Sequence, residues 1–269
     1  LSRFRSMMRG MSTPDIPFNR EKPTQAGEVA RLAPLVRRVL ASNAGPFTFT
    51  GTCTYIVGEG KVAVIDPGPA DEAHIDALLA ATKGETISAI LVTHTHRDHS
   101  PGARLLQART KAPIIGCATH IPRADPPSGR LDASHDLDHA PDEVLSDGAI
   151  FKGDGFTLEA IATPGHASNH LAFALHEENG LFSGDHVMAW STSIVAPPDG
   201  HMRDYMASLE KIAARDESVY WPGHGNALQE PQRFVRLLAM HRRQRESAIL
   251  ERLAQGDRSI ADIVRVIYK

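Results

Sequence analysis

The chain has 269 residues, of which 42% are hydrophobic, so it can bury a sizeable core without staples. Its 29 lysines and arginines nearly balance its 32 aspartates and glutamates, which excludes a generally basic protein that coats nucleic acid. The only two cysteines, Cys53 and Cys117, exclude a disulfide scaffold and are expected to be buried free thiols. Because no uncharged apolar run approaches the roughly 18 residues of a membrane span, we expect a soluble globular protein.

Residues 1–25 show no apolar periodicity and are expected to form a poorly ordered extension. Arg3, Arg5 and Arg9 occur there with no acidic residue before Asp15, a faint resemblance to a mitochondrial transit peptide. An artificial remnant or an upstream extension explains this segment better. The predicted location is therefore the cytoplasm, with the mitochondrial matrix as the alternative.

From about residue 35 the sequence alternates between predicted strands and helices. Short β-branched runs bounded by glycine or proline predict strands at 35–41, 54–58, 61–66, 87–93 and 112–119. Apolar residues at helical spacing predict helices over 71–84 and 104–110. Residues 122–147 are rich in proline, aspartate, serine and histidine, which is typical of a surface insertion.

The second half of the chain repeats this alternation. Strands are predicted at 156–164, 170–178, 180–187 and 218–225, and helices at 205–214, 231–254 and from 259 onwards. Asn179-Gly180 between two apolar runs predicts a hairpin. Ser259 and Asp262 are spaced like a capping box at the start of the last helix.

Fourteen histidines are present, and one run of them is the most informative motif in the sequence. His94, His96, Asp98 and His99 directly follow the apolar strand 87–93. In extended backbone His94 and His96 project to the same side, because side chains alternate along a strand. Four groups that can bind a metal thus stand at one rigid strand end.

Three more candidate ligands lie at the ends of other predicted strands. His166, Asp185 and His224 each follow a glycine, which permits a tight turn that presents the side chain. A lone histidine in a loop is usually an ordinary surface residue. Five histidines and two aspartates in this arrangement are instead enough for two metal ions with an open coordination position.

These motifs resemble those of the metallo-β-lactamase superfamily over roughly residues 50–230. Within it, the segments TPGHASNH, LFSGDHV, DYMASLEKI and YWPGHG are most similar to the β-lactamase-like protein 2 group. The resemblance implies an αββα sandwich over residues 26–230. It also implies that 231–269 form a helical extension, which is part of a winged-helix-like element.

The resemblance also assigns roles to individual residues. It implies that His94, His96 and His166 hold a first metal ion, that Asp98, His99 and His224 hold a second, and that Asp185 bridges them. Asp66 would support these ligands without binding metal itself. Tyr205, Thr192 and Ser193 would line the pocket.

Neutral imidazoles and carboxylates favour zinc or a similar divalent ion. Two such ions can share a hydroxide that acts as the nucleophile, which predicts a metal-dependent hydrolase. Asp98 is expected to orient the hydroxide and Asp185 to set the metal separation. His170 is a candidate for protonating the leaving group, although a supporting or core role fits it equally well.

The substrate is less determined, because one fold supports many hydrolytic reactions. Some members of the resembled group are endonucleases that act on single-stranded RNA, and an RNA phosphodiester is the first expectation. Arg242, Arg243 and Arg245 could contact phosphates, or could form a solvated helix face with Glu246 and Glu251. A small lactone, ester, thioester or β-lactam is the alternative. No membrane partner is expected, and the oligomeric state is open.

Two other classes of protein fit the sequence less well. A non-catalytic, metal-stabilised binding protein is disfavoured because no ligand position is lost. A di-iron oxygen-reducing protein is disfavoured because such relatives carry a carboxylate in place of the second histidine of the run. The remaining histidines are expected to play no chemical part: His74, His120, His135, His139, His176, His186, His201 and His241.

Overall fold

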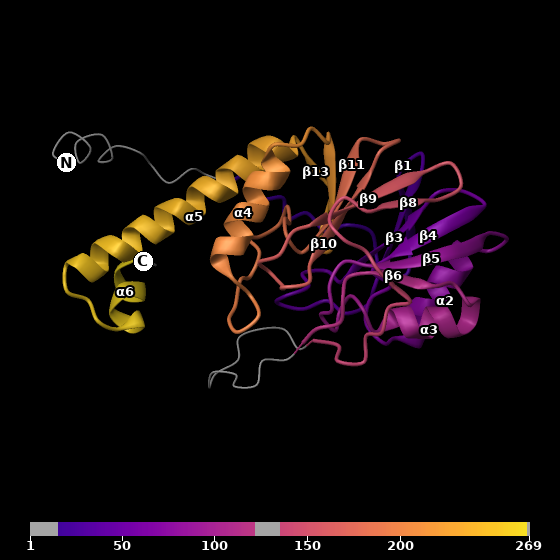
Figure 1. The fold of residues 1–269 in the computed structure, drawn as a ribbon, viewed down its shortest axis with the longest axis horizontal. Coiled ribbons are helices and arrows are strands. Elements are labelled where there is room, and N and C mark those ends of the chain that lie inside the picture. The colour runs from indigo at the N-terminus through magenta and orange to yellow at the C-terminus, as the bar shows by residue number, and fades with distance from the viewer. Residues whose placement is uncertain (1–15, 122–134, 268–269) are drawn as a thin grey trace.

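Two β-sheets lie at the centre of the chain in a computed structural model that describes residues 16–121 and 135–267 (Figure 1). The first sheet has seven strands in sequence order, β1 (Val29–Ala33), β2 (Val36–Leu40), β3 (Cys53–Val57), β4 (Lys61–Ile65), β5 (Thr86–Val92), β6 (Ile114–Gly116) and β7 (Glu143–Val144). The second has six strands in the order β13 (Leu228–Gln229), β12 (Val219–Pro222), β11 (Gly180–Gly184), β10 (Leu171–Leu175), β9 (Thr157–Ala162) and β8 (Ile150–Lys152).

Helices cover the outer faces of both sheets. The first sheet carries α2 (Glu72–Ala81) and α3 (Gly102–Thr110), and the second carries α4 (Met202–Ala213) and the start of α5 (Pro231–Ala254). A last helix, α6 (Ile260–Ile267), packs against α5. The order helix, sheet, sheet, helix confirms the predicted αββα sandwich.

Two apolar cores hold these layers together. The larger core joins β3 and β5 of the first sheet, helices α2 and α3, and aromatic side chains of the second sheet such as Phe182 and Trp221. The smaller core lies between the second sheet and helices α4 and α5. Cys53 and Cys117 are buried free thiols, as predicted. Burial of this apolar surface fixes the strand ends that carry the polar residues.

The regular elements follow the sequence closely. Asp71 caps α2 by accepting a hydrogen bond from Ala73 N, and Ser259 accepts one from Asp262 N at the start of α6. The predicted hairpin is present, with Leu175 opposite Gly180. Strands β1, β7, β8 and β13 were not predicted, because they are short and their sequences lack a clear apolar alternation.

The predicted N-terminal extension is described only in part, since residues 1–15 lie outside the described residues. The remainder differs from a poorly ordered segment. Ile16 is buried against the smaller core, and the Phe18 ring meets Phe234 edge-on with centroids 5.9 Å apart. These two apolar side chains pack this segment against the smaller core. The predicted insertion is likewise described only from residue 135, where it contributes β7.

The first and second halves of α5 have different surroundings. Phe234, Val235 and Leu238 belong to the smaller core, whereas Leu250 and Leu253 are exposed. The start of the helix therefore packs as part of the sandwich, although we expected the extension to begin at residue 231. Among the described residues no helix is long and apolar enough to cross a membrane.

Candidate metal centre

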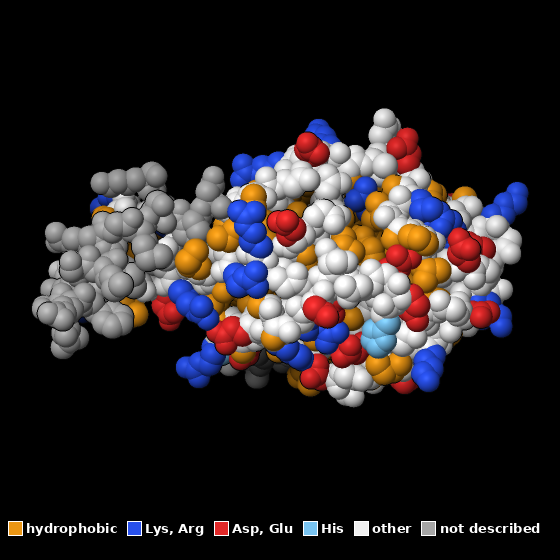
Figure 2. All heavy atoms as spheres, turned by 90° about the horizontal axis from the view of Figure 1, so that it is seen from above, with side chains coloured by type: hydrophobic (Ala, Val, Ile, Leu, Met, Phe, Trp, Pro, Cys, Tyr) orange, Lys and Arg blue, Asp and Glu red, His pale blue; other side chains and the backbone are white. Residues whose placement is uncertain are grey.

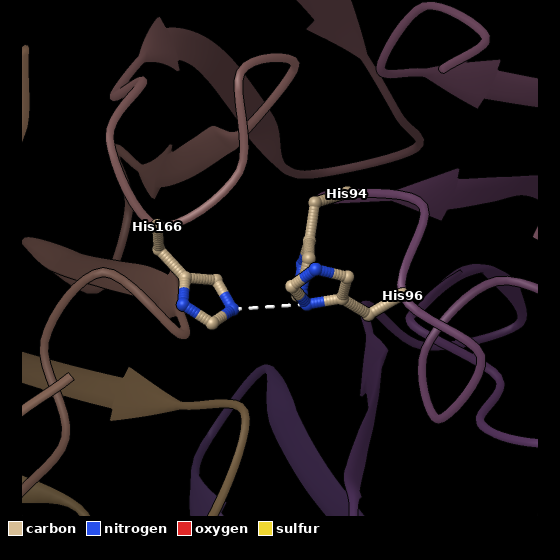
Figure 3. Close-up of side chains that lie close together, drawn as sticks. All are labelled: His94, His96 and His166. Carbon is tan, nitrogen blue, oxygen red and sulfur yellow. Dashed lines mark hydrogen bonds between the residues drawn. The ribbon is translucent and has the colours of Figure 1, made fainter. Parts of the chain in front are cut away.

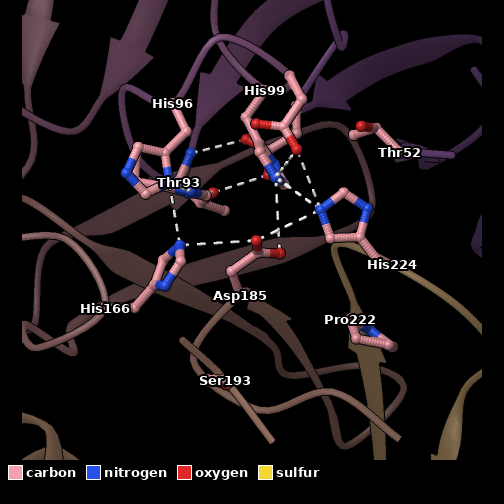
Figure 4. A network of polar contacts seen from close by, with 12 residues as sticks. Thr52, Thr93, His96, His99, His166, Asp185, Ser193, Pro222 and His224 are labelled. Atoms are coloured by element: carbon pink, nitrogen blue, oxygen red, sulfur yellow. Dashed lines mark hydrogen bonds and ion pairs between the residues drawn. The ribbon is translucent and has the colours of Figure 1, made fainter. Parts of the chain in front are cut away.

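All seven predicted ligands converge where four strands end (Figure 4). They stand after β5 (His94, His96, Asp98 and His99), after β9 (His166), after β11 (Asp185) and after β12 (His224). Because β5 belongs to one sheet and the other three strands to the second, the sandwich itself brings the groups together. Asp98 has the most exposed side chain, at 23%, whereas the side chains of His166 and Asp185 are 9% and 8% exposed.

Three histidines form the first group of donors (Figure 3). His96 Nδ1 lies 3.0 Å from His94 Nε2 and 3.0 Å from His166 Nε2. The other ring nitrogens of two of them are occupied: His94 Nδ1 hydrogen-bonds Thr93 Oγ1, and His166 Nδ1 donates to the carbonyl of Ile194. The Nε2 atoms of His94 and His166 thus keep lone pairs, and both face His96 Nδ1.

Four side chains form the second group, in which two carboxylates surround two histidines. His224 Nε2 lies 3.2 Å from Asp98 Oδ2, 3.3 Å from Asp185 Oδ2 and 3.3 Å from His99 Nε2. Asp185 Oδ2 is also 3.6 Å from His166 Nε2 in the first group. Asp185 therefore stands between the two groups, which is where a bridging ligand must stand.

The donor set fits divalent cations. His99 Nδ1 donates to Asp66 and His224 Nδ1 donates to the carbonyl of Gly51, so both Nε2 lone pairs face each other across 3.3 Å. Asp185 Oδ1 has no hydrogen-bond partner among the described residues. Buried lone pairs and a buried carboxylate oxygen are costly unless a cation lies between them.

The electrostatics of the groups agree with this fit. Burial lowers the pKa of His94 and of His96 well below the ordinary 6.5, so both imidazoles stay neutral and can act as ligands. Burial alone would also lower the pKa of His224, but the charge of Asp185 raises it to about 10. Two carboxylates thus make this position favourable for a positive charge.

Asp66 supports the candidate metal centre through hydrogen bonds to Thr93 and His99. It has a left-handed backbone conformation (φ 49°), and its carboxylate accepts from Thr93 N at 2.8 Å, Thr93 Oγ1 at 2.7 Å and His99 Nδ1 at 2.9 Å. Through Thr93 it also orients His94. The predicted supporting carboxylate therefore contacts His99 directly and His94 through Thr93, two of the candidate ligands that it was expected to orient.

The position of His170 does not suit the protonation of a leaving group. Its Nε2 accepts a hydrogen bond from the backbone N–H of Asp185 at 3.1 Å, and its Nδ1 hydrogen-bonds Thr163 Oγ1 at 2.8 Å. Both ring nitrogens are thus used inside the protein, and the side chain is fully buried. His170 positions Asp185, which favours the supporting role over the acid.

Two residues expected to line the pocket do not do so. Tyr205 is fully buried, and its hydroxyl donates to the carbonyl of His186 at 3.1 Å. Ser193, also buried, donates to the same carbonyl at 2.8 Å. They fix the loop that follows Asp185, whereas Thr192 is half-buried on that loop. The resemblance matched these residues by position in the sequence, which does not determine the direction of their side chains.

The three arginines of the basic stretch all have partners within the chain. Arg242 donates to the carbonyl of Ser193 and lies over the Tyr205 ring at 5.5 Å. Arg243 pairs with Glu210 on α4, and Arg245 donates to the carbonyl of Ile267. These partners differ from Glu246 and Glu251, which helical spacing suggested. The packing of α5 against α4 and α6 determines which groups each arginine contacts.

One group of polar residues was missed by the sequence analysis. His120 and His135, which were expected to play no chemical part, meet Asp199 close to His96. Nothing in their spacing indicates this meeting, because loops far apart in the sequence bring them together.

Comparison with known proteins agrees with the fold. Residues 47–224 match the family model of the metallo-beta-lactamase superfamily, which covers more than half of the chain. The chain therefore belongs to the metallo-beta-lactamase superfamily, whose characteristic His-x-His-x-Asp-His run it contains. It is a hydrolase of that superfamily, with clusters of histidine and aspartate suited to metal ions.

Individual relatives are similar over most of their length. The chain is 32% identical over 253 residues to the beta-lactamase-like protein 2 homolog of Drosophila melanogaster, covering 90% of this chain and 82% of that one. It is 31% identical over 242 residues to the atrochrysone carboxyl ACP thioesterase AgnL7 of Paecilomyces divaricatus, covering 88% and 71%. A beta-lactamase domain protein from Burkholderia ambifaria superposes with a TM-score of 0.73 at 19% identity, covering 94% and 88%.

Proposed function

We propose that the chain hydrolyses a small acyl thioester at a centre that holds two divalent ions, most favourably zinc. His94, His96 and His166 would hold one ion, Asp98, His99 and His224 the other, and Asp185 would bind both. The observation that carries this proposal is the position of Asp185, within 3.6 Å of donor nitrogens in both groups. Imidazole and carboxylate donors are those that zinc prefers.

When bound, such ions lower the pKa of a shared water towards neutrality and polarise the substrate carbonyl. Asp98 is suited to orient the attacking water, because its side chain is the most exposed of the seven and its Oδ2 lies 3.2 Å from His224. As a carboxylate it can accept a hydrogen bond from that water.

The thioester class is supported by the leaving group that it contains. Hydrolysis adds water across the carbon–sulfur bond and releases a carboxylate and a thiol. A thiol of the cysteine type has a pKa of about 8.5, so its thiolate departs without a dedicated acid. This suits a site in which His170 is already committed to Asp185 and Thr163. The thioesterase name of one relative supports the same class.

An RNA substrate has less support. Arg242, Arg243 and Arg245 are engaged by a carbonyl, a carboxylate and a second carbonyl. On the face seen in Figure 2, acidic side chains are interspersed among the basic ones. Phosphate binding depends on a local excess of positive charge, and these arginines do not provide one.

The test compares substrates and metal content in one preparation. Protein depleted with a chelator and then reloaded with zinc is offered an acyl-pantetheine thioester, a lactone, a β-lactam and a single-stranded RNA oligonucleotide. We expect thioester turnover that depends on added zinc and exceeds turnover of the other three. Zinc-dependent RNA cleavage without thioester turnover would overturn the substrate assignment, and turnover unaffected by metal removal would overturn the metal centre.

A further inference from the structure

A second cluster of polar side chains, one buried and two largely buried, lies beside the candidate metal centre. His120, His135 and Asp199 each offer one donor atom within 4.8 Å of the others. His135 Nε2 lies 3.3 Å from Asp199 Oδ2, and His120 Nδ1 lies 3.6 Å from Asp199 Oδ1. The three side chains are only 10%, 5% and 9% exposed. Two imidazoles therefore face one carboxylate away from water.

Three separate parts of the chain supply this cluster. His120 follows β6, and His135 forms an isolated bridge with His96 in the segment after β5. Asp199 lies on the loop before α4 and accepts a hydrogen bond from the backbone of Ser168. The imidazole rings of His120 and His135 stack with centroids 3.6 Å apart and planes at 2°. This parallel stacking aligns their nitrogens with the two oxygens of Asp199.

His135 is the best fixed member of the cluster. Its Nδ1 hydrogen-bonds Thr95 Oγ1 at 2.9 Å, and Thr95 Oγ1 also accepts from Asn169 Nδ2. Its Nε2 is buried and makes no hydrogen bond among the described residues, although it faces Asp199. A buried ring nitrogen that is oriented and left without a hydrogen bond is costly unless something else binds it.

Among the described residues outside the candidate metal centre, the other histidine–carboxylate pairs are more exposed than this cluster. His201 lies 2.9 Å from Asp204, but the two side chains are 60% and 51% exposed. His176 lies 3.5 Å from Glu159, with 47% and 23% exposure. Such pairs are solvated and have one histidine each. The cluster around Asp199 has two histidines and excludes most water.

We infer that His120, His135 and Asp199 form an additional binding site for a divalent transition metal, with zinc as the preferred ion. Two imidazoles and one carboxylate are a known ligand set for zinc that leaves a fourth position for water or another ligand. The same donors also suit cobalt, which provides a spectroscopic probe. The inference rests on this cluster alone and holds whether or not the proposed substrate is correct.

Binding would require a small rearrangement of the stacked rings. The lone pairs of parallel rings do not converge, whereas ligands of a tetrahedral ion approach it from different directions. The His120 and His135 rings must therefore tilt apart around the ion. An ion held there would link the segment after β6 to the loop before α4, next to the His96 ring, whose centroid is 4.7 Å from that of His135.

The experiment counts metal ions per chain. Wild-type protein and the variants His120→Ala, Asp199→Asn and His120→Cys are dialysed against buffered micromolar zinc, and bound metal and protein are quantified. We expect one equivalent fewer in His120→Ala and Asp199→Asn than in the wild type. His120→Cys should restore it, because a thiolate is also a zinc ligand. Loaded with cobalt, His120→Cys should show a thiolate-to-cobalt charge-transfer band that the wild type lacks.

His201→Ala is the matched control, since it removes a histidine beside a carboxylate in the same region and should leave the metal count unchanged. The cysteine variant guards against misfolding, because only a ligand role explains recovery by cysteine and not by alanine. Equal metal counts in the wild type, His120→Ala and Asp199→Asn would overturn the inference. A cobalt-loaded His120→Cys protein without the charge-transfer band would do so too.

Discussion

Asp66 Oδ2 lies 2.9 Å from His99 Nδ1 and so determines which nitrogen of that ring faces the metal centre. The same carboxylate accepts two hydrogen bonds from Thr93, whose hydroxyl contacts His94. One residue on the first sheet therefore orients a histidine in each donor group. This relationship leads to a test of how far the centre depends on residues that do not face it.

Asp66→Asn should weaken zinc binding by about 10- to 100-fold, because an amide cannot accept all three hydrogen bonds and the histidines lose their fixed tautomers. Competition with a chelator of known affinity measures the change. Asp71→Asn is the control, since it alters a carboxylate that caps α2 and lies outside both donor groups. An unchanged zinc affinity in Asp66→Asn would contradict the supporting role.

Asp98→Ala should reduce turnover by orders of magnitude in zinc-saturated protein, because the attacking water loses its acceptor. Asp185→Asn should reduce turnover similarly and should also lower the number of tightly bound ions, since an amide bridges poorly. Circular dichroism should show an intact fold for both variants, because the residues stand on loops over separately packed cores. Near-wild-type turnover by Asp98→Ala would exclude its assigned role.

His170→Ala separates positioning from acid catalysis. Without the imidazole, the backbone N–H of Asp185 is buried and unpaired, which costs about 1–3 kcal/mol of stability or displaces Asp185. We expect a lower kcat with the shape of the pH–rate profile unchanged. Loss of one limb of that profile would show instead that His170 transfers a proton during the reaction.

The candidate ligands could be recognised in the sequence because each stands in a short local motif, and the resemblance to a known family predicted that these motifs meet. Each ligand stands directly after a strand, and Gly165, Gly184 and Gly223 mark the turns. At Gly165 and Gly184 the backbone takes positive φ angles, and a Cβ at Gly223 would come within 2.5 Å of Asp185 Oδ1. These requirements leave a mark in the sequence that is visible before the fold is known.

Other features depend on contacts between distant segments and leave no such mark. The meeting of His120, His135 and Asp199 requires segments far apart in the sequence to come together. The partners of Arg242 and Arg243 depend on how α5 packs against α4, which helical periodicity alone does not fix. Side-chain direction decides function at these positions, and a one-dimensional pattern does not contain it.

His74 should make stability sensitive to mild acid. Burial lowers its pKa to about 4. Between pH 6.5 and 4 the His74 imidazole is therefore protonated in the unfolded chain and neutral in the folded chain. This contribution favours the folded state above pH 6.5 and is lost as the pH falls, at up to about 1.4 kcal/mol per pH unit. The free energy of unfolding, measured with urea from pH 7 to 4.5, should therefore fall less steeply in His74→Gln than in the wild type. Parallel pH dependence in the two proteins would contradict this role.

Replacing Arg242, Arg243 and Arg245 by alanine tests the basic stretch. Arg242 is packed over Tyr205 and bonded to the loop that follows Asp185, so its removal should lower the midpoint of thermal unfolding. Arg243→Ala alone should change stability by less than about 1 kcal/mol, because its pair with Glu210 is solvent-exposed.

Binding of a single-stranded RNA oligonucleotide, measured by fluorescence anisotropy at low salt, should be weak in the wild type and equally weak in the triple variant. Tight wild-type binding that falls steeply with salt, and is lost in the triple variant, would instead establish the phosphate contacts and return RNA to the first place among substrates.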